Sequence, residues 1–196
     1  MDRLIAVLFM LTALGVASAE DQAAPPAPDT LRVCGDGKPA RKPAPHLKAL
    51  HEIELDAAVC EPGRETYRAT MVEFHHSQQF SSVRIDVWRD GRAAVTVKET
   101  ESTFMPRRDP KRLLIDRARM LTMDELGRFR RTFDASPFWT MEVWPRDLSC
   151  VPGGMVIIEA VRDGRYREVG RYCGFEEPPM IELLDLISGL HRSLKP

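Results

Sequence analysis

The chain has no excess of charge of either sign. Its 196 residues carry 28 Lys and Arg against 29 Asp and Glu, a formal net charge of −1. This balance gives no electrostatic reason to expect a nucleic acid as the partner. After the first 19 residues no apolar run approaches the length of about 20 residues that spans a bilayer. We therefore expect no membrane insertion of the mature chain.

The motifs of common catalytic and cofactor sites are also missing. None of the four cysteines forms a C-x-x-C pair, which argues against a redox dithiol or a zinc knuckle. There is no G-x-S-x-G, and Gly35-Asp36-Gly37-Lys38 lacks the spacing of a phosphate loop. His51-Glu52 begins like a zinc-protease helix, but Leu55 stands where the second ligand should be. We predict no catalytic residue, no metal and no cofactor.

Residues 1–19 have the parts of a secretory signal. The start, Met-Asp-Arg, is charged, an apolar stretch runs from Leu4 to Val16, and the segment ends in Ala17-Ser18-Ala19. We predict cleavage after Ala19 and a periplasmic or secreted mature protein. Residues 20–45 contain six prolines, which favours an extended leader without regular structure. Residues 46–196 are expected to form a single domain.

The cysteine count agrees with export. An even number of cysteines in an exported chain predicts disulfides, and four cysteines allow three connectivities. We favour Cys34–Cys60 and Cys150–Cys173, because the last two lie just beyond the open ends of a predicted hairpin.

The clearest local signal is a β-hairpin around Asp90-Gly91. Alternating apolar residues precede and follow it: Val83, Ile85, Val87, then Ala93, Val95 and Val97. A two-residue loop would put the two apolar sets on opposite faces. A three-residue loop, Arg89-Asp90-Gly91, pairs Val87 with Ala93 and places all of them on one face. We predict the three-residue loop, with Gly91 in the left-handed conformation.

The tetrapeptide Arg-Asp-Gly-Arg returns at residues 162–165 and predicts a second hairpin. A three-residue loop places Glu159 opposite Arg167. A two-residue loop would place Glu159 opposite Glu168, which like-charge repulsion disfavours. We therefore favour the three-residue loop here too.

A helix is predicted after each hairpin. Thr122-Met-Asp-Glu125 is a capping box, and Leu126, Phe129 and Phe133 form the buried stripe that follows it. The second helix begins near Pro178-Pro179, with Leu183, Leu184, Ile187 and Leu190 on its apolar face. Weaker patterns indicate a helix within 46–58, a strand over 65–76 and a further strand at 113–115.

This order resembles an uncharacterised group of secreted bacterial proteins. Its members share a strand–Asp-Gly–strand hairpin, a helix opened like Leu121-Thr-Met-Asp-Glu-Leu126, and a second hairpin and helix. The resemblance covers roughly residues 65–192 and implies no activity. We predict an α+β fold: an antiparallel sheet built from two or more β-hairpins, with two amphipathic helices packed on one face.

Two surface features are candidates for binding. Trp88, Arg84 and Asp86 lie on the sheet face opposite the apolar stripe, and an uncovered face would make Trp88 an anchor for a partner. The alternative is that the leader or a helix covers this face. The second feature is the basic connection Arg107, Arg108, Lys111 and Arg112, which suits an anionic envelope component.

We therefore expect an exported, non-enzymatic envelope protein that binds another macromolecule, with inhibitors of hydrolases as one subclass by analogy of architecture. The alternative is a hydrolase with a Ser/His site built from His75, His76, Ser77, Ser81 and Ser82. We expect these serines to lie in a loop that enters the first hairpin, with Phe80 turned toward the core. Adjacent histidines on a strand point to opposite faces, which makes a shared metal unfavourable.

Overall fold

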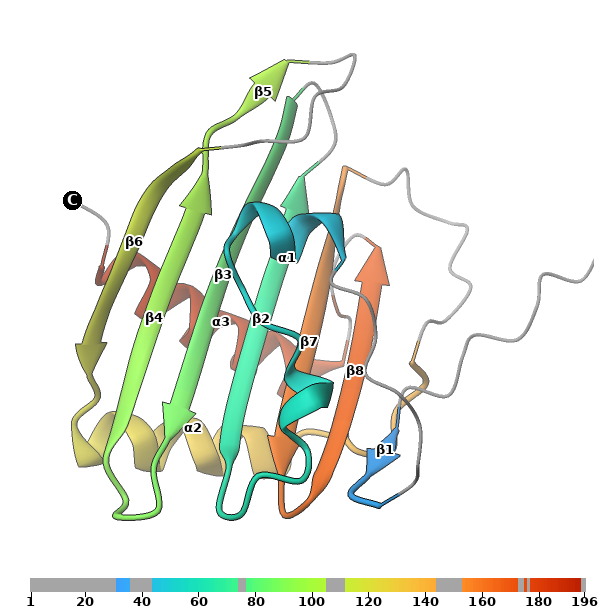
Figure 1. Cartoon of the computed structure of the whole chain (residues 1–196), viewed down its shortest axis with the longest axis vertical. Coiled ribbons are helices and arrows are strands. Elements are labelled where there is room, and N and C mark those ends of the chain that lie inside the picture. Colours follow the sequence, from blue (N-terminus) through green and yellow to red (C-terminus); the bar gives the residue numbers. More distant parts are fainter. Residues whose placement is uncertain are drawn as a thin grey trace, which may run out of the picture.

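Alternating apolar residues build one large antiparallel sheet in the computed structural model, which describes residues 31–35, 44–73, 77–104, 112–143, 153–172, 175 and 177–194. The strands are β1 (Arg32–Val33), β2 (Glu65–Glu73), β3 (Ser77–Val87), β4 (Ala93–Thr100), β5 (Thr103–Phe104), β6 (Leu113–Met120), β7 (Gly154–Arg162) and β8 (Arg165–Tyr172). They lie in the order β1-β8-β7-β2-β3-β4-β6, with β5 beside the start of β3. Figure 1 shows this order across the sheet.

Helices cover the sheet from both sides. The long helices α2 (Met123–Ala135) and α3 (Pro178–Arg192) pack on one side, here called the helix face. The short helix α1 (Pro45–Ala49) and the 3-10 helix η1 (Leu55–Ala58) lie on the other side, here called the second face (Figure 1). The predicted α+β class is confirmed. None of the described helices has the length and apolar character that a bilayer crossing requires.

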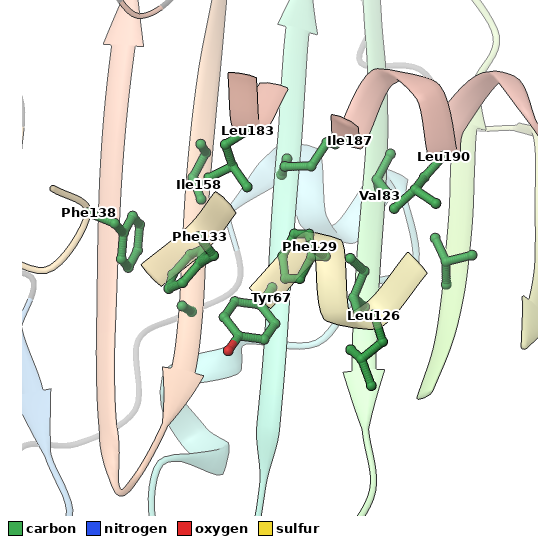
Figure 2. Packing of buried hydrophobic residues seen from close by; sticks show 14 of the residues in the cluster. Tyr67, Val83, Leu126, Phe129, Phe133, Phe138, Ile158, Leu183, Ile187 and Leu190 are labelled. Atoms are coloured by element: carbon green, nitrogen blue, oxygen red, sulfur yellow. The ribbon is translucent and has the colours of Figure 1, made fainter. Parts of the chain in front are cut away.

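The main core lies between the sheet and the two long helices. The Tyr67 ring meets Phe129 and Phe133 edge to face, with centroid distances of 4.9 and 4.6 Å (Figure 2). Val83 and the buried residues of α3 close the same cluster, among them Leu183, Ile187 and Leu190. The predicted burial of the first hairpin's apolar stripe under a helix is confirmed.

The first hairpin has the predicted register. Val87 pairs with Ala93, and Ile85 pairs with Val95. The amide of Gly91 donates to the Trp88 carbonyl oxygen (2.9 Å), and Gly91 has φ +84°. The three-residue loop with a left-handed glycine is therefore confirmed. The three-residue loop is more stable than the two-residue loop because only its register buries the β-branched residues of both strands on one face.

The second hairpin has a different register from the one predicted. Arg162 pairs with Arg165, so the loop has only the two residues Asp163 and Gly164, and Glu159 lies opposite Glu168. Both loop residues have positive φ (53° and 69°), the conformation of a type I′ turn, which Asp-Gly favours. The expected repulsion is reduced because Arg68 pairs with Glu159, and the single O–H of Tyr166 lies between the two carboxylates, 3.1 and 3.2 Å from their oxygens. The three-residue prediction was wrong.

The capping box at the start of α2 is confirmed. The amide of Glu125 donates to Thr122 Oγ1 (3.2 Å), and the Glu125 carboxylate accepts from the Thr122 amide (2.9 Å). This exchange satisfies amides that the first turn leaves unbonded. Leu126 and the two phenylalanines of the predicted stripe are buried.

One disulfide joins Cys34 to Cys60, as predicted. It ties β1 to the segment after η1. The prediction that residues 20–45 lack regular structure fails at two places, because Arg32–Val33 pairs with β8 and Pro45 opens α1. Proline fits that first helical position. Cys150 and Cys173 lie outside the described residues.

Two strand boundaries and the position of Phe80 differ from the sequence-based expectation. The serines at 77, 81 and 82 belong to β3 and not to an entering loop. Phe80 is buried on the second face with Leu50 and Val72, away from the main core. The predicted strand at 113–115 extends to Met120, where it forms β6 beside β4. Polar residues interrupt the apolar alternation of both strands, so the sequence pattern did not show their full length.

Candidate binding surface

The second face has a covered half and an open half. Residues paired across strands make this visible: Arg68 on β2 lies beside Arg84 on β3, which faces Thr96 on β4, which faces Ala118 on β6. Arg68 is 1% exposed, whereas Ala118 is exposed. Residues 44–63, with α1 and η1, lie over β2, β3 and β7 and leave most of β6 open in Figure 1, while Lys98 on β4 is buried against residues 51 and 52.

The covered half contains a buried salt bridge. Arg68 Nε and Nη2 lie 2.7 and 2.6 Å from Glu159 Oε2, and Arg68 Nη1 donates to the Ile53 carbonyl oxygen at 2.6 Å. The bridge joins β2 to β7, and the bond to Ile53 joins both strands to residues 44–63, here called the covering segment. A buried charge is tolerated when it is paired and hydrogen-bonded in this way.

Glu52 from the covering segment extends this network. Its carboxylate bonds Arg84, lies 3.2 Å from Lys98 Nζ and 3.5 Å from Arg68 Nη1. Lys98 Nζ also donates to the His51 carbonyl oxygen at 2.8 Å. One buried acid therefore holds cations from β2, β3 and β4 under residues 51–53. We assign these charges a structural role.

Burial shifts the pKa of two groups in the covered half. It raises the pKa of Glu159 to about 7, against the opposing effect of the Arg68 guanidinium. Burial, together with the smaller effect of the Arg68 guanidinium, lowers the pKa of His46 to about 4. Both shifts favour the neutral form of a group held away from water.

Two of the predicted binding residues belong to this network. Arg84 Nε lies 2.8 Å from Asp86 Oδ2, and the same guanidinium bonds Glu52. Asp86 Oδ1 accepts from the Thr66 hydroxyl at 3.0 Å and lies 3.4 Å from Arg64 Nη2. Their polar groups bond within the chain, and so they offer a partner less than the sequence pattern indicated.

The open half carries exposed apolar side chains around a floor of small residues. Trp88 is 45% exposed and Met120 is 50% exposed. The Arg92 guanidinium lies 5.9 Å from the Trp88 ring centroid. We call the following five residues the open surface: Trp88, Ala94, Thr96, Ala118 and Met120. Of the predicted anchors, Trp88 alone lies on it.

The outer edge of β6 borders the open surface. Among the described residues no strand pairs with this edge, because β6 ends the sheet order. The Leu121 amide donates to the Ala93 carbonyl oxygen at 2.9 Å. Bonded and outward-pointing residues alternate along an antiparallel strand, so Arg119 and Arg117 are bonded to β4. The backbone groups that point outward belong to Asp116, Ala118 and Met120.

The basic connection is described only in part. Arg112 is exposed, with Nε 3.6 Å from Glu101 Oε2. Arg107, Arg108 and Lys111 lie outside the described residues, and their role stays a prediction.

A groove of about 440 Å³ lies between α2 and α3. Its lining mixes signs: Arg119 is hydrogen-bonded to Glu125 at 2.8 and 3.0 Å, and Arg128, Glu182 and Asp185 line the rest. This mixture selects no particular ligand charge. No group of three His, Cys, Asp or Glu side chains among the described residues is arranged to hold a metal.

The serines of the hydrolase alternative do not share a site. Ser81 and Ser82 are adjacent on β3 and therefore point to opposite faces. Ser82 is buried under the covering segment. Ser81 faces Glu99 across the strands, and Glu99 Oε2 lies 3.3 Å from His191 Nε2 on α3. His75 and His76 lie outside the described residues, so the site predicted with them is not described.

Sequence reasoning missed the free edge and the buried network. A signal for the network was present: the predicted strand 65–76 carries Arg68 among apolar residues, and the 155–161 strand carries Glu159 in the same way. Two opposite charges inside apolar strands favour a buried pair. The proposed membership of a group of secreted proteins stays a prediction. Known family models give no match to this chain, and neither does a sequence search of curated proteins.

Proposed function

We propose that the protein is an exported, non-enzymatic binding module that holds a protein partner through the open surface. One observation supports this proposal above all. Trp88 and Met120 are both about half exposed on the same face of the sheet, and they flank a floor of small residues beside the free edge of β6. Aromatic and methionine side chains are enriched in protein interfaces, and flat apolar patches with polar rims are typical of them.

The contrast with the covered half supports this choice of surface. There the charged groups bond each other and residues 51–53, which leaves little for a partner to recognise. The Cys34–Cys60 disulfide supports a location outside the cytoplasm, because disulfides persist in oxidising compartments. Inhibition of an envelope hydrolase would be one form of such binding.

Capture from an envelope extract tests the proposal. The immobilised mature protein is compared with Trp88→Ala and Met120→Ser on the open surface. Ile181→Ser on α3 is the matched control, because Ile181 is 43% exposed and apolar like Trp88 but lies on the helix side. Cross-linked partners are identified by mass spectrometry, and hydrogen exchange of the complex locates the protected amides.

We expect both open-surface variants to lose a protein that wild type and Ile181→Ser retain, with protection on β4 and β6. Equal capture by all four proteins would contradict the proposal, as would the capture of no protein. Loss only after charge reversal of Arg107 and Arg108 would assign binding to the basic connection instead.

A further inference from the structure

The outer edge of β6 has the features of a site for an added strand. It runs from Leu113 to Met120 at the end of the sheet, and no described strand covers it. The N–H and C=O groups of three alternate residues face away from β4: Asp116, Ala118 and Met120, of which the Met120 carbonyl oxygen accepts a hydrogen bond from Arg119 Nη1 at 3.1 Å. Extended peptides bind to such edges through main-chain hydrogen bonds, and side-chain pockets supply the specificity.

The side chains of β6 are divided between two environments. Arg117 and Arg119 lie on the helix face, beside the end of α3, where Arg117 Nη1 donates to the Leu194 carbonyl oxygen at 3.4 Å. Ala118 and Met120 lie on the open surface. The exposed Asp116 lies on the same face as Ala118 and Met120. An added strand would therefore meet cations on one side, and on the other side two apolar groups followed by one acid.

The two cations differ in how far they are neutralised. Arg119 makes two hydrogen bonds with the Glu125 carboxylate. Arg117 is exposed, and its contact with Leu194 uses one of the five N–H donors of a guanidinium. Arg117 is thus the charge best placed to bond a carboxylate on a neighbouring strand, and opposite charges directly across strands are stabilising.

A second copy of this chain fits the edge poorly. In an antiparallel pair related by two-fold symmetry, the residue on the axis faces its own copy. The two registers that overlap most of β6 are centred on Asp116 or on Arg117. Each register puts like charges opposite one another, which is destabilising. Cations on an edge strand are a common defence against such self-pairing.

We propose that β6 accepts an extended acidic segment of the protein partner as an added antiparallel strand, with a partner carboxylate opposite Arg117 and apolar partner residues over Ala118 and Met120. This proposal rests on the proposed function, since it names the chemistry of the partner at the same surface. It commits to a peptide because the edge offers main-chain donors and acceptors, which a polysaccharide or polyphosphate would not match in register.

The test uses a synthetic peptide of about nine residues that alternates Glu with Val, the length needed to cover an eight-residue edge. Its affinity for the mature protein is measured by calorimetry, and the protected amides are located by hydrogen exchange with NMR detection. Two control peptides replace Glu by Lys or carry N-methyl groups on alternate residues. Polyphosphate serves as a polyanion that cannot form a strand.

Two variants of the protein separate charge from backbone pairing. Arg117→Glu reverses the exposed charge. Ala118→Pro removes an N–H that points away from β4, which an edge strand tolerates. Ile181→Ser again serves as the control.

We expect protection of the Asp116, Ala118 and Met120 amides by the Glu peptide and none by the N-methylated peptide. Arg117→Glu should lower the affinity for the Glu peptide about tenfold and raise the affinity for the Lys peptide about tenfold, which is the effect expected of one paired charge. Ala118→Pro should abolish binding of the Glu peptide.

The inference is overturned by unchanged affinity in Arg117→Glu, by equal binding of the N-methylated peptide, by stronger binding of polyphosphate, or by protection away from β6. These results leave the proposed function standing if Trp88→Ala still loses the captured protein. If Trp88→Ala captures as much protein as wild type while the peptide still protects β6, the proposed role of the open surface is refuted and the strand addition at β6 is not.

Discussion

The two halves of the second face have the same strand alternation but different physical roles. Arg68 and Ala118 lie on one line across the sheet, yet Arg68 is buried in a salt bridge and Ala118 is exposed. The difference comes from residues 44–63, which lie over β2, β3, β7 and β8 and reach Lys98 on β4 but leave most of β6 uncovered (Figure 1). Polar residues on one face of a sheet therefore indicate a binding surface only where no other segment covers them.

The largest effect should come from breaking the Arg68–Glu159 bridge. Arg68→Ala leaves the buried Glu159 carboxylate without its cation and removes one of the three cations around Glu52, and we expect a loss of about 3–5 kcal/mol in the free energy of unfolding. Ala118→Ser on the same line should change it by less than about 0.5 kcal/mol. Urea unfolding of both variants measures this contrast. Similar losses of unfolding free energy in the two variants would contradict the claim that the two halves differ in their contribution to stability.

Removal of the disulfide should have the next largest effect. The two cysteines are 26 residues apart, and the chain-entropy relation gives a loss of about 3.5 kcal/mol for Cys34→Ser with Cys60→Ser. Because the bond ties β1 to the covering segment, amide exchange should rise in β1 and residues 55–60 more than in β4 and β6. Equal acceleration in all of these strands would show that the bond does not act on the cover.

The pH dependence of stability should separate the two shifted groups of the covered half. The folded-state pKa of Glu159 is raised from 4.5 to about 7, so the folded state binds the extra proton and stability falls as pH rises through that interval. The folded-state pKa of His46 is lowered from 6.5 to about 4, so its contribution to stability rises as pH rises. The two slopes oppose each other between about pH 5 and 6.5.

Single variants should therefore reveal opposite slopes. Glu159→Gln should leave a free energy of unfolding that rises with pH, and His46→Gln should leave one that falls, each by at most about 1.4 kcal/mol per pH unit. Denaturant unfolding at several pH values measures both. Slopes of the same sign in the two variants would contradict the assignment of the shifts to these groups.

The smallest stability effects should come from the open surface. Trp88→Ala and Met120→Ser expose no buried group, and we expect changes within about 0.5 kcal/mol. Differential scanning calorimetry checks this. A loss comparable to that of the disulfide variant would mean that Trp88 packs into the fold, and the open half would then resemble the covered half.

Local sequence rules predicted the elements whose partners are close in the chain. The first hairpin followed from one apolar stripe and Gly91, and the start of α2 followed from Thr122 and Glu125. Here the deciding interactions involve neighbouring residues, so the sequence contains them directly. The Cys34–Cys60 bond was also predicted, although its partners are 26 residues apart.

The second hairpin shows why other features escaped prediction. The rule against opposing Glu159 and Glu168 is sound for exposed pairs, but Tyr166 and Arg68 engage these carboxylates in the folded chain. Arg68 comes from a strand far away in sequence, so no local pattern reveals its contribution. The cover of the second face and the free edge of β6 depend in the same way on the order of all the strands.

The most direct test of the account compares two variants whose mutated residues share one line across the sheet. The dissociation constant of the alternating Glu–Val peptide is measured for Ala118→Pro and for the double variant Arg68→Met with Glu159→Leu, which replaces the buried ion pair by apolar groups and should keep the protein folded. We expect lost binding in Ala118→Pro and wild-type affinity in the double variant. Wild-type affinity in Ala118→Pro together with lost binding in the folded double variant would contradict it.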